Sequence, residues 1–183
     1  MENLLNDIIR KRRSVFPLQY NGELVSDSTI DEILYNANTA PTHKMTQPWL
    51  FKVFSCNSKL KLADEIIRLK SEKELSDHIK NNITKKFKLS SHVICMSRDK
   101  NEVIPEWEEL AATSMSVQNM WLTCTSYDLG CYWSSPALIS KLHSFLNLEE
   151  NEKCLGLFYI GKYDNLPERN IIRDSINNKV EWI

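Results

Sequence analysis

Residues 40–49 read APTHKMTQPW, and the fold is decided by this stretch together with the segments on either side of it. Upstream, residues 26–29 are all helix-capping types, and apolar residues then recur at helical spacing. The sequence therefore predicts a helix that ends before Pro41. Downstream, residues 50–56 are aromatic and β-branched, which predicts a strand. The stretch is expected to connect a helix to a strand.

This connection is polar and is bracketed by Pro41 and Pro48. It concentrates hydrogen-bonding groups, above all His43 and Gln47, between two fixed ends. One interpretation is a rigid link whose side chains are simply solvated. The other is a binding loop, because binding residues tend to lie on loops held by a rigid scaffold. The density of donors and acceptors favours the binding loop.

A second polar motif lies upstream, where residues 10–16 read RKRRSVF. It follows a predicted helix over residues 3–12, so its arginines could simply complement the negative end of the helix dipole. A basic run can also contact nucleic acid or a targeting receptor, but a formal net charge of -1 argues against a polyanion-binding protein. The third interpretation is a phosphate clamp, in which Arg12, Arg13 and Ser14 satisfy several phosphate oxygens at once.

A third motif, GCYWSSP, occupies residues 130–136. Gly130 is expected to end a long helix in the left-handed conformation. Residues 131–134 are expected to form a short strand, and residues 135–136 to begin another helix. The free N–H groups at such a helix start suit an anion or a polarised carbonyl. Aromatic strands are usually core, so this motif carries little weight by itself.

The remaining segments give an α+β order rather than a regular series of βαβ units. Further helices are predicted over residues 58–70, 73–87, 105–129 and 135–146, and further strands over residues 93–96 and 155–160. The helix that Pro105 opens places apolar side chains on more than one face. A chain with about four short strands cannot cover all of them, and a two-fold partner is the simplest cover.

Composition excludes several classes of protein. Apolar residues make up 42% and charged residues 26%, which indicates a folded domain. The five scattered cysteines are typical of reduced thiols in a cytoplasmic protein, and neither a signal peptide nor a bilayer-spanning apolar run is present. His78, His92 and His143 have no mutual metal-ligand spacing and are expected at the surface or at helix caps, so no metal site is predicted.

Four motifs in order, RKRRSVF, APTHKMTQPWLFKV, DLGCYWSSP and LGLFYIG, resemble the nitroreductase family, and most closely its compact members. The match covers almost the whole chain in order and spacing. The resemblance implies an α+β fold with a central mixed or antiparallel sheet flanked by helices. It also implies a single domain over residues 1–183, a long core helix at a homodimer interface, and a C-terminal arm, about residues 163–183, that packs on the partner.

The resemblance further implies an FMN site shared by two subunits. Arg12, Arg13 and Ser14 match the R-R-S motif that holds the FMN phosphate and ribityl chain. His43 and Gln47 match positions that contact the partner's flavin. The remaining matches are the segment beside the isoalloxazine ring, the end of the last strand and a late basic residue, namely Trp133, Ser134, Ser135, Gly161, Lys162 and Arg173.

The activity implied is that of an NAD(P)H oxidoreductase, in which FMN passes a hydride to a nitroaromatic, a quinone or a similar small acceptor by ping-pong chemistry. Because the flavin carries the chemistry, no side chain is named as catalytic. The alternative is a protein of the same fold that carries flavin without turnover. Compact relatives commonly have an arginine where this chain has Ser134, and this departure keeps the alternative open.

Overall fold

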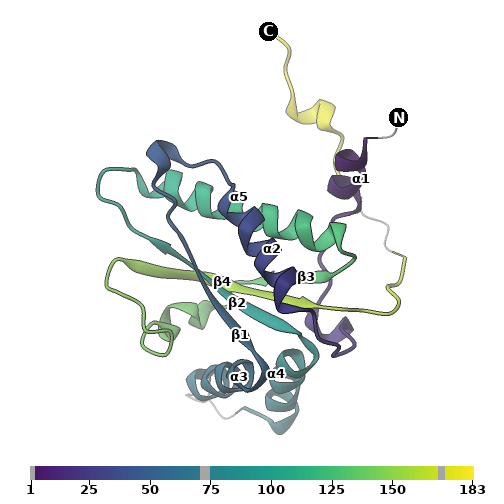
Figure 1. The fold of residues 1–183 in the computed structure, drawn as a ribbon, viewed down its shortest axis with the longest axis vertical. Coiled ribbons are helices and arrows are strands. Elements are labelled where there is room, and N and C mark those ends of the chain that lie inside the picture. Colours follow the sequence, from purple (N-terminus) through teal and green to yellow (C-terminus); the bar gives the residue numbers. More distant parts are fainter. Residues whose placement is uncertain (1–2, 71–74, 169–171) are drawn as a thin grey trace.

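In a computed structural model, which describes residues 3–70, 75–168 and 172–183, the four strands of that part of the chain form one antiparallel sheet (Figure 1). The strands are β1 (Trp49–Ser55), β2 (His92–Asp99), β3 (Gly130–Ser134) and β4 (Glu152–Gly161), in the spatial order β1-β2-β4-β3. Every neighbouring pair is antiparallel, and Gly130 lies opposite Gly161 in the β3–β4 register. The predicted α+β class is confirmed, and the sheet is antiparallel throughout.

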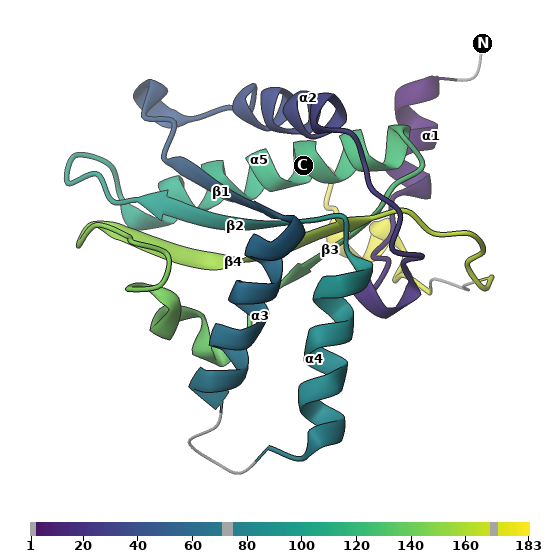
Figure 2. The ribbon, with the colours of Figure 1, turned by 60° about the horizontal axis from the view of Figure 1, so that its bottom comes forward.

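Five α-helices and four 3₁₀ helices surround the sheet in the described residues. Helices α2 and α5 cover one face, and α3 and α4 cover the other (Figure 2). The α-helices are α1 (Leu4–Lys11), α2 (Asp27–Asn38), α3 (Cys56–Lys70), α4 (Asp77–Leu89) and α5 (Glu106–Ser126). The 3₁₀ helices are η1 (Pro17–Gln19), η2 (His43–Met45), η3 (Ala137–Leu142) and η4 (Ile176–Lys179).

The two central strands supply both cores because successive side chains of a strand point to opposite faces. On β2, Val93 packs in the core beneath α3 and α4, whereas Ile94 packs in the core beneath α2 and α5. On β4, Leu157 and Phe158 divide in the same way. His92 begins β2 and is buried, so the expectation that it lies at the surface was wrong.

Several predicted boundaries differ from the structure. The long helix ends at Ser126 rather than near Leu129, because the left-handed residue that follows it is Asp128 (φ 52°) and Leu129 N–H then donates to the Cys124 carbonyl at 2.8 Å. Gly130 instead begins β3. The helix predicted over residues 135–146 is the short η3. The helix predicted over residues 73–87 begins at Asp77, and residues 73–74 lie outside the described residues.

Helix α1 and the C-terminal segment are not buried by this chain. No residue of α1 is buried, although its apolar spacing is that of a helix with one packed face. The C-terminal segment runs past α1 and away from the sheet (Figure 1), and Trp182 near its end is 95% exposed. Both elements expose apolar surface that the rest of the described chain does not cover.

Candidate functional site

The loop between α2 and β1 has an unusual backbone. Lys44, Met45 and Gln47 all have positive φ angles, at 49°, 57° and 47°. Left-handed conformations cost non-glycine residues on the order of 1–3 kcal/mol each and persist only where the surroundings impose them. Here the Thr42 hydroxyl lies 2.9 Å from that of Thr46 and accepts from the Gln47 N–H at 3.2 Å. A loop held in this conformation supports its interpretation as a binding loop.

Within this loop, His43 contacts α5. Its Nδ1 pairs with Oε2 of Glu108, in the first turn of the helix. The two side chains border an open, largely apolar hollow of about 440 Å³. Its other lining residues are Pro41, Thr42, Trp107, Ala111, Ala112 and Met115. Gln47 belongs to the same loop and is exposed.

At the other end of α5, Arg12 takes up a defined position. Helix α1 ends at Lys11, and Arg12 has an extended ψ of 122°, which turns the chain out of the helix. The Arg12 guanidinium lies over the ring of Trp121, 5.0 Å from its centroid. Trp121 in turn packs edge-on against the buried Phe158 and donates from Nε1 to the Arg13 carbonyl at 3.3 Å. The sheet core thus supports Arg12 through Trp121.

Arg12 shares a hollow of about 650 Å³ with Arg10 and Arg173. The remaining lining residues are Ile9 and Gln118, so no carboxylate lines this hollow among the described residues. Three guanidinium groups around one hollow are suited to an anion, because each offers a fork of donors that matches phosphate or carboxylate oxygens. The sequence indicated Arg12 through its motif, and Arg173 only through the family resemblance. Arg10 was part of the same basic run, whereas Gln118 and Trp121 were not predicted as site residues.

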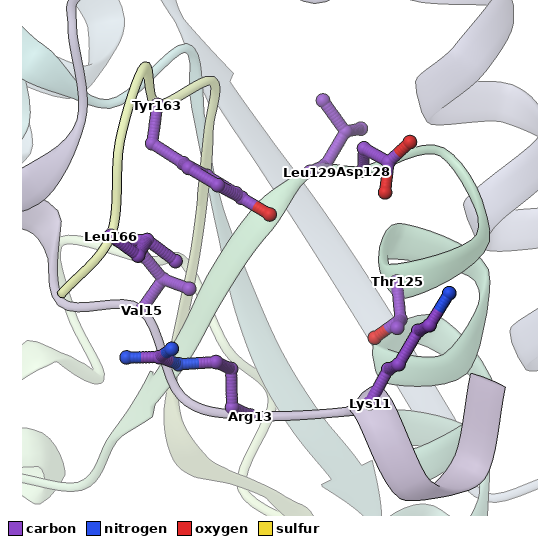
Figure 3. A pocket seen from close by; sticks show the side chains of 8 residues that line it. All are labelled: Lys11, Arg13, Val15, Thr125, Asp128, Leu129, Tyr163 and Leu166. Carbon is purple, nitrogen blue, oxygen red and sulfur yellow. The ribbon is translucent and has the colours of Figure 1, made fainter. Parts of the chain in front are cut away.

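The Arg13 side chain does not line this hollow. Its Nη1 and Nη2 both donate to the Pro167 carbonyl, at 3.3 and 3.4 Å. Figure 3 shows it in a separate pocket of about 270 Å³ together with Lys11, Asp128 and Tyr163. Burial raises the pKa of Tyr163, Asp128 raises it further, and Arg13 acts in the opposite direction. The structure therefore places Arg12 and Arg13 in different pockets, and the partly buried Ser14 follows them.

The third motif lies along β3. Trp133 is partly buried, and its Nε1 has no hydrogen-bond partner within the described part of the chain. A Cβ added to Gly156 would lie 2.3 Å from this Nε1, so only glycine leaves room for the indole there. Ser134 borders another hollow, of about 360 Å³, whose other lining residues are Phe16, Pro17, Leu18, Lys86, Tyr132 and Tyr159. Ser135 is exposed.

Gly161 and Lys162 have partners within the chain. A Cβ on Gly161 would lie 2.5 Å from the ring of Tyr20, whose hydroxyl donates to the Val15 carbonyl at 2.8 Å. The Lys162 ammonium lies 3.2 Å from the Glu23 carboxylate. These contacts fix the segment after the R-R-S motif against the end of β4.

We expect Gly161→Ala to destabilise the protein without FMN by about 1–3 kcal/mol, because the new methyl group would overpack the buried Tyr20 ring. Urea denaturation of the apoprotein measures the loss. The same substitution in a Tyr20→Leu background should cost less, since the side chain facing the methyl group is smaller and more flexible. An unchanged midpoint for Gly161→Ala would contradict this packing role.

Among the cysteines, one pair lies close together, with 3.2 Å between the Sγ atoms of Cys95 and Cys154. Four of the cysteines are buried, and all five are free thiols. Burial and the neighbouring Cys124 raise the pKa of the Cys131 thiol, so it stays protonated and unreactive.

No three His, Cys, Asp or Glu side chains gather closely enough to hold a metal ion within the described ranges. Likewise, none of the helices described is long and apolar enough to cross a membrane.

One chain does not bring all the predicted site residues together. Arg12 and Arg173 share a hollow near Trp121, whereas His43 contacts Glu108. Thirteen residues of helix separate Glu108 from Trp121, which corresponds to roughly 20 Å along the axis. Fold and site define an α+β domain with an arginine-lined hollow at one end of its long helix and a constrained polar loop at the other.

Comparisons with known proteins identify the family. The model of the Nitroreductase family matches residues 9–162, so the chain belongs to this family. It is 29% identical over 182 residues to a Bacillus subtilis (strain 168) protein named "Putative NAD(P)H nitroreductase YfhC", with coverage of 94% of this chain and 92% of the relative.

Solved structures share the fold of this chain. The crystal structure of a nitroreductase-like family protein from Bacillus cereus is similar, with a TM-score of 0.84, 25% identity, and coverage of 100% of this chain and 97% of the other. A nitroreductase with bound FMN from Bacteroides fragilis NCTC 9343 shares the fold, with a TM-score of 0.71, 19% identity, and coverage of 93% and 95%. The predicted nitroreductase-like fold is confirmed.

Proposed function

We propose that this protein is a cytoplasmic, homodimeric, FMN-dependent NAD(P)H oxidoreductase of the nitroreductase type. The observation that carries the proposal is the hollow in which Arg10, Arg12 and Arg173 meet. The family membership and the name of the Bacillus subtilis relative support the same activity. The Bacteroides fragilis nitroreductase with bound FMN provides the example of a flavin on this fold.

The residues present fit FMN. Its terminal phosphate carries close to two negative charges. The three guanidinium groups offer only donors and positive charge, and the Gln118 amide would add a neutral N–H donor. Ser14 lies two residues after Arg12 and would hold the ribityl chain or the phosphate. Trp133 lies on β3, and its buried Nε1 is available as a donor to a ligand. The Arg13 side chain instead donates to the Pro167 carbonyl and anchors that segment. Arg13 is therefore linked to this site only because it follows Arg12 in the chain.

Bound FMN would supply the hydride chemistry, which no side chain of this protein can perform. The protein would contribute binding, orientation and exclusion of water. The arginines would anchor the phosphate end, and the ring would be held at the subunit interface, where NAD(P)H and then a small acceptor such as a nitroaromatic or quinone would bind in turn. No side chain acts as an acid or a nucleophile in this proposal.

The homodimer is supported by uncovered apolar surface. On α5, Trp107, Leu110 and Met115 are 68%, 42% and 40% exposed, although they belong to the longest helix described. Further exposed apolar side chains lie on α1 and the C-terminal segment, namely Leu4, Leu5, Ile9, Ile172, Ile176, Val180, Trp182 and Ile183. Gathered exposed apolar side chains of this kind commonly mark a protein–protein interface. We infer that a second copy covers it, and that the arm over residues 163–183 docks on the partner.

A two-fold partner would also complete the site. The arginine hollow and the His43 loop lie at opposite ends of α5. If two α5 helices pack antiparallel across the axis, the loop of one subunit approaches the hollow of the other. We therefore propose that His43 and Gln47 contact the flavin of the partner subunit.

The purified protein should be yellow, and heat-released flavin should chromatograph as FMN rather than FAD. Addition of NADH or NADPH without oxygen should bleach the colour, because the flavin accepts the hydride. A flavin that stays yellow with both nucleotides would favour the alternative, a flavin carrier without turnover. Recovered FAD would contradict the cofactor assignment.

A further inference from the structure

The contact between His43 and Glu108 joins the loop to the helix. Glu108 is the third residue of α5, and its side chain is only 22% exposed. His43 is the first residue of η2 and is half-exposed. No other charged side chain lines their shared hollow among the residues described there. The imidazole is therefore the only titratable side chain that faces the carboxylate among the residues that line this hollow.

The chemistry of this contact determines which imidazole nitrogen carries a proton. An ionised carboxylate only accepts hydrogen bonds, so the Nδ1 atom that pairs with Glu108 must carry a proton. The other nitrogen, Nε2, is then the one left for a ligand. The bonds between Thr42, Thr46 and Gln47 hold the backbone of the loop that carries this ring. Both the orientation and the proton position of His43 thus depend on Glu108.

We propose that Glu108 is a positioning residue, which holds the imidazole of His43 with Nδ1 protonated so that Nε2 faces the flavin of the partner subunit. This inference rests on the proposed function. Trp107 and Met115, on the same helix, provide an apolar border that suits the edge of a planar aromatic ring. Glu108 itself contacts His43 and not the cofactor.

The test compares Glu108→Ala with Glu108→Gln in the full-length protein. The glutamine oxygen can still accept from Nδ1, whereas alanine cannot. The first readout is the protonation of the His43 nitrogens, measured on the apoprotein at pH 8 by long-range ¹H–¹⁵N correlation and assigned with His43→Gln. We expect a protonated Nδ1 in the wild type and in Glu108→Gln, and a mixture of the two neutral forms in Glu108→Ala.

The second readout is the Kd of FMN, followed by quenching of flavin fluorescence. Glu108→Ala should raise it about tenfold, the loss expected for one hydrogen bond to a charged or polarised group, and Glu108→Gln should restore most of the affinity. Glu32→Ala, an exposed carboxylate on α2, is the matched control and should leave both readouts unchanged. Thermal unfolding of each variant shows whether it is folded.

Two results would overturn the proposal, namely an unprotonated Nδ1 in the wild-type apoprotein, or wild-type FMN affinity in a folded Glu108→Ala. Failure of the proposed function looks different. A wild-type protein that binds no FMN would contradict the flavin assignment, whereas the imidazole readout would still report whether Glu108 fixes His43.

Discussion

Replacing Arg12 with alanine is expected to raise the Kd of FMN about ten- to a hundredfold. The guanidinium is held over Trp121 and faces a hollow that it shares with Arg10 and Arg173. One charge-assisted hydrogen bond contributes on the order of 1.5–3 kcal/mol, which corresponds to that range of affinity. Because the side chain is already ordered on Trp121, little conformational entropy is lost when it binds the phosphate. Titration of the apoprotein with FMN measures the effect.

Lys11→Ala and Arg13→Ala are the matched controls. Both residues are basic and lie next to Arg12, but both line the other pocket, beside Tyr163 (Figure 3). Lys11→Ala should change FMN affinity less than twofold to threefold, the ordinary scatter for a screened surface charge. Arg13→Ala should lower the unfolding midpoint more than the affinity, since it removes the bonds to the Pro167 carbonyl. Equal losses of affinity at all three positions would contradict the specific role of Arg12. They would show that the basic run acts only as a general electrostatic patch.

The sequence was sufficient to predict the type of the main elements. Helix α2 shows the 3.6-residue spacing of one packed face, whereas β2 and β4 are short, nearly continuous apolar runs, as is typical of strands that are buried on both faces. The family motifs then order these elements into a fold. The positions of Arg12 and Arg173 relative to each other follow from that fold, because α1 and the late basic residue meet at one end of α5.

Other features depend on contacts that local sequence does not encode. The separation of Arg12 from Arg13 arises from one extended ψ angle after α1. Glu108 pairs with a residue 65 positions away, and nothing in its neighbourhood marks it as different from Glu106, which pairs with Arg98 instead. Asp128 rather than Gly130 takes the left-handed position, since Gly130 is needed where a side chain would meet Tyr20. Such choices are made by packing partners that are distant in sequence.

Met115→Glu is expected to convert the proposed dimer into a monomer and to abolish tight FMN binding. Met115 is 40% exposed on α5 and borders the hollow of His43 and Glu108. If a second copy covers this helix, the substitution places an unpaired carboxylate in an apolar interface, close to the existing carboxylate of Glu108. Light scattering at micromolar concentration should give about twice the chain mass of 21.4 kDa for the wild type, and about one chain mass for the variant.

Ile79→Glu provides the control, since Ile79 is a helical residue of similar exposure, 42%, on the opposite side of the sheet. It should leave both the mass and the FMN affinity unchanged. Dimerisation and cofactor binding are linked in the proposed site, because His43 and Gln47 act on the partner's flavin. FMN should therefore raise the thermal midpoint of the wild type and of Ile79→Glu by mass action, and that of Met115→Glu far less. A monomer that is saturated with FMN would contradict both the dimer and the shared site, and would require His43 to reach the arginine hollow of its own chain across the length of α5.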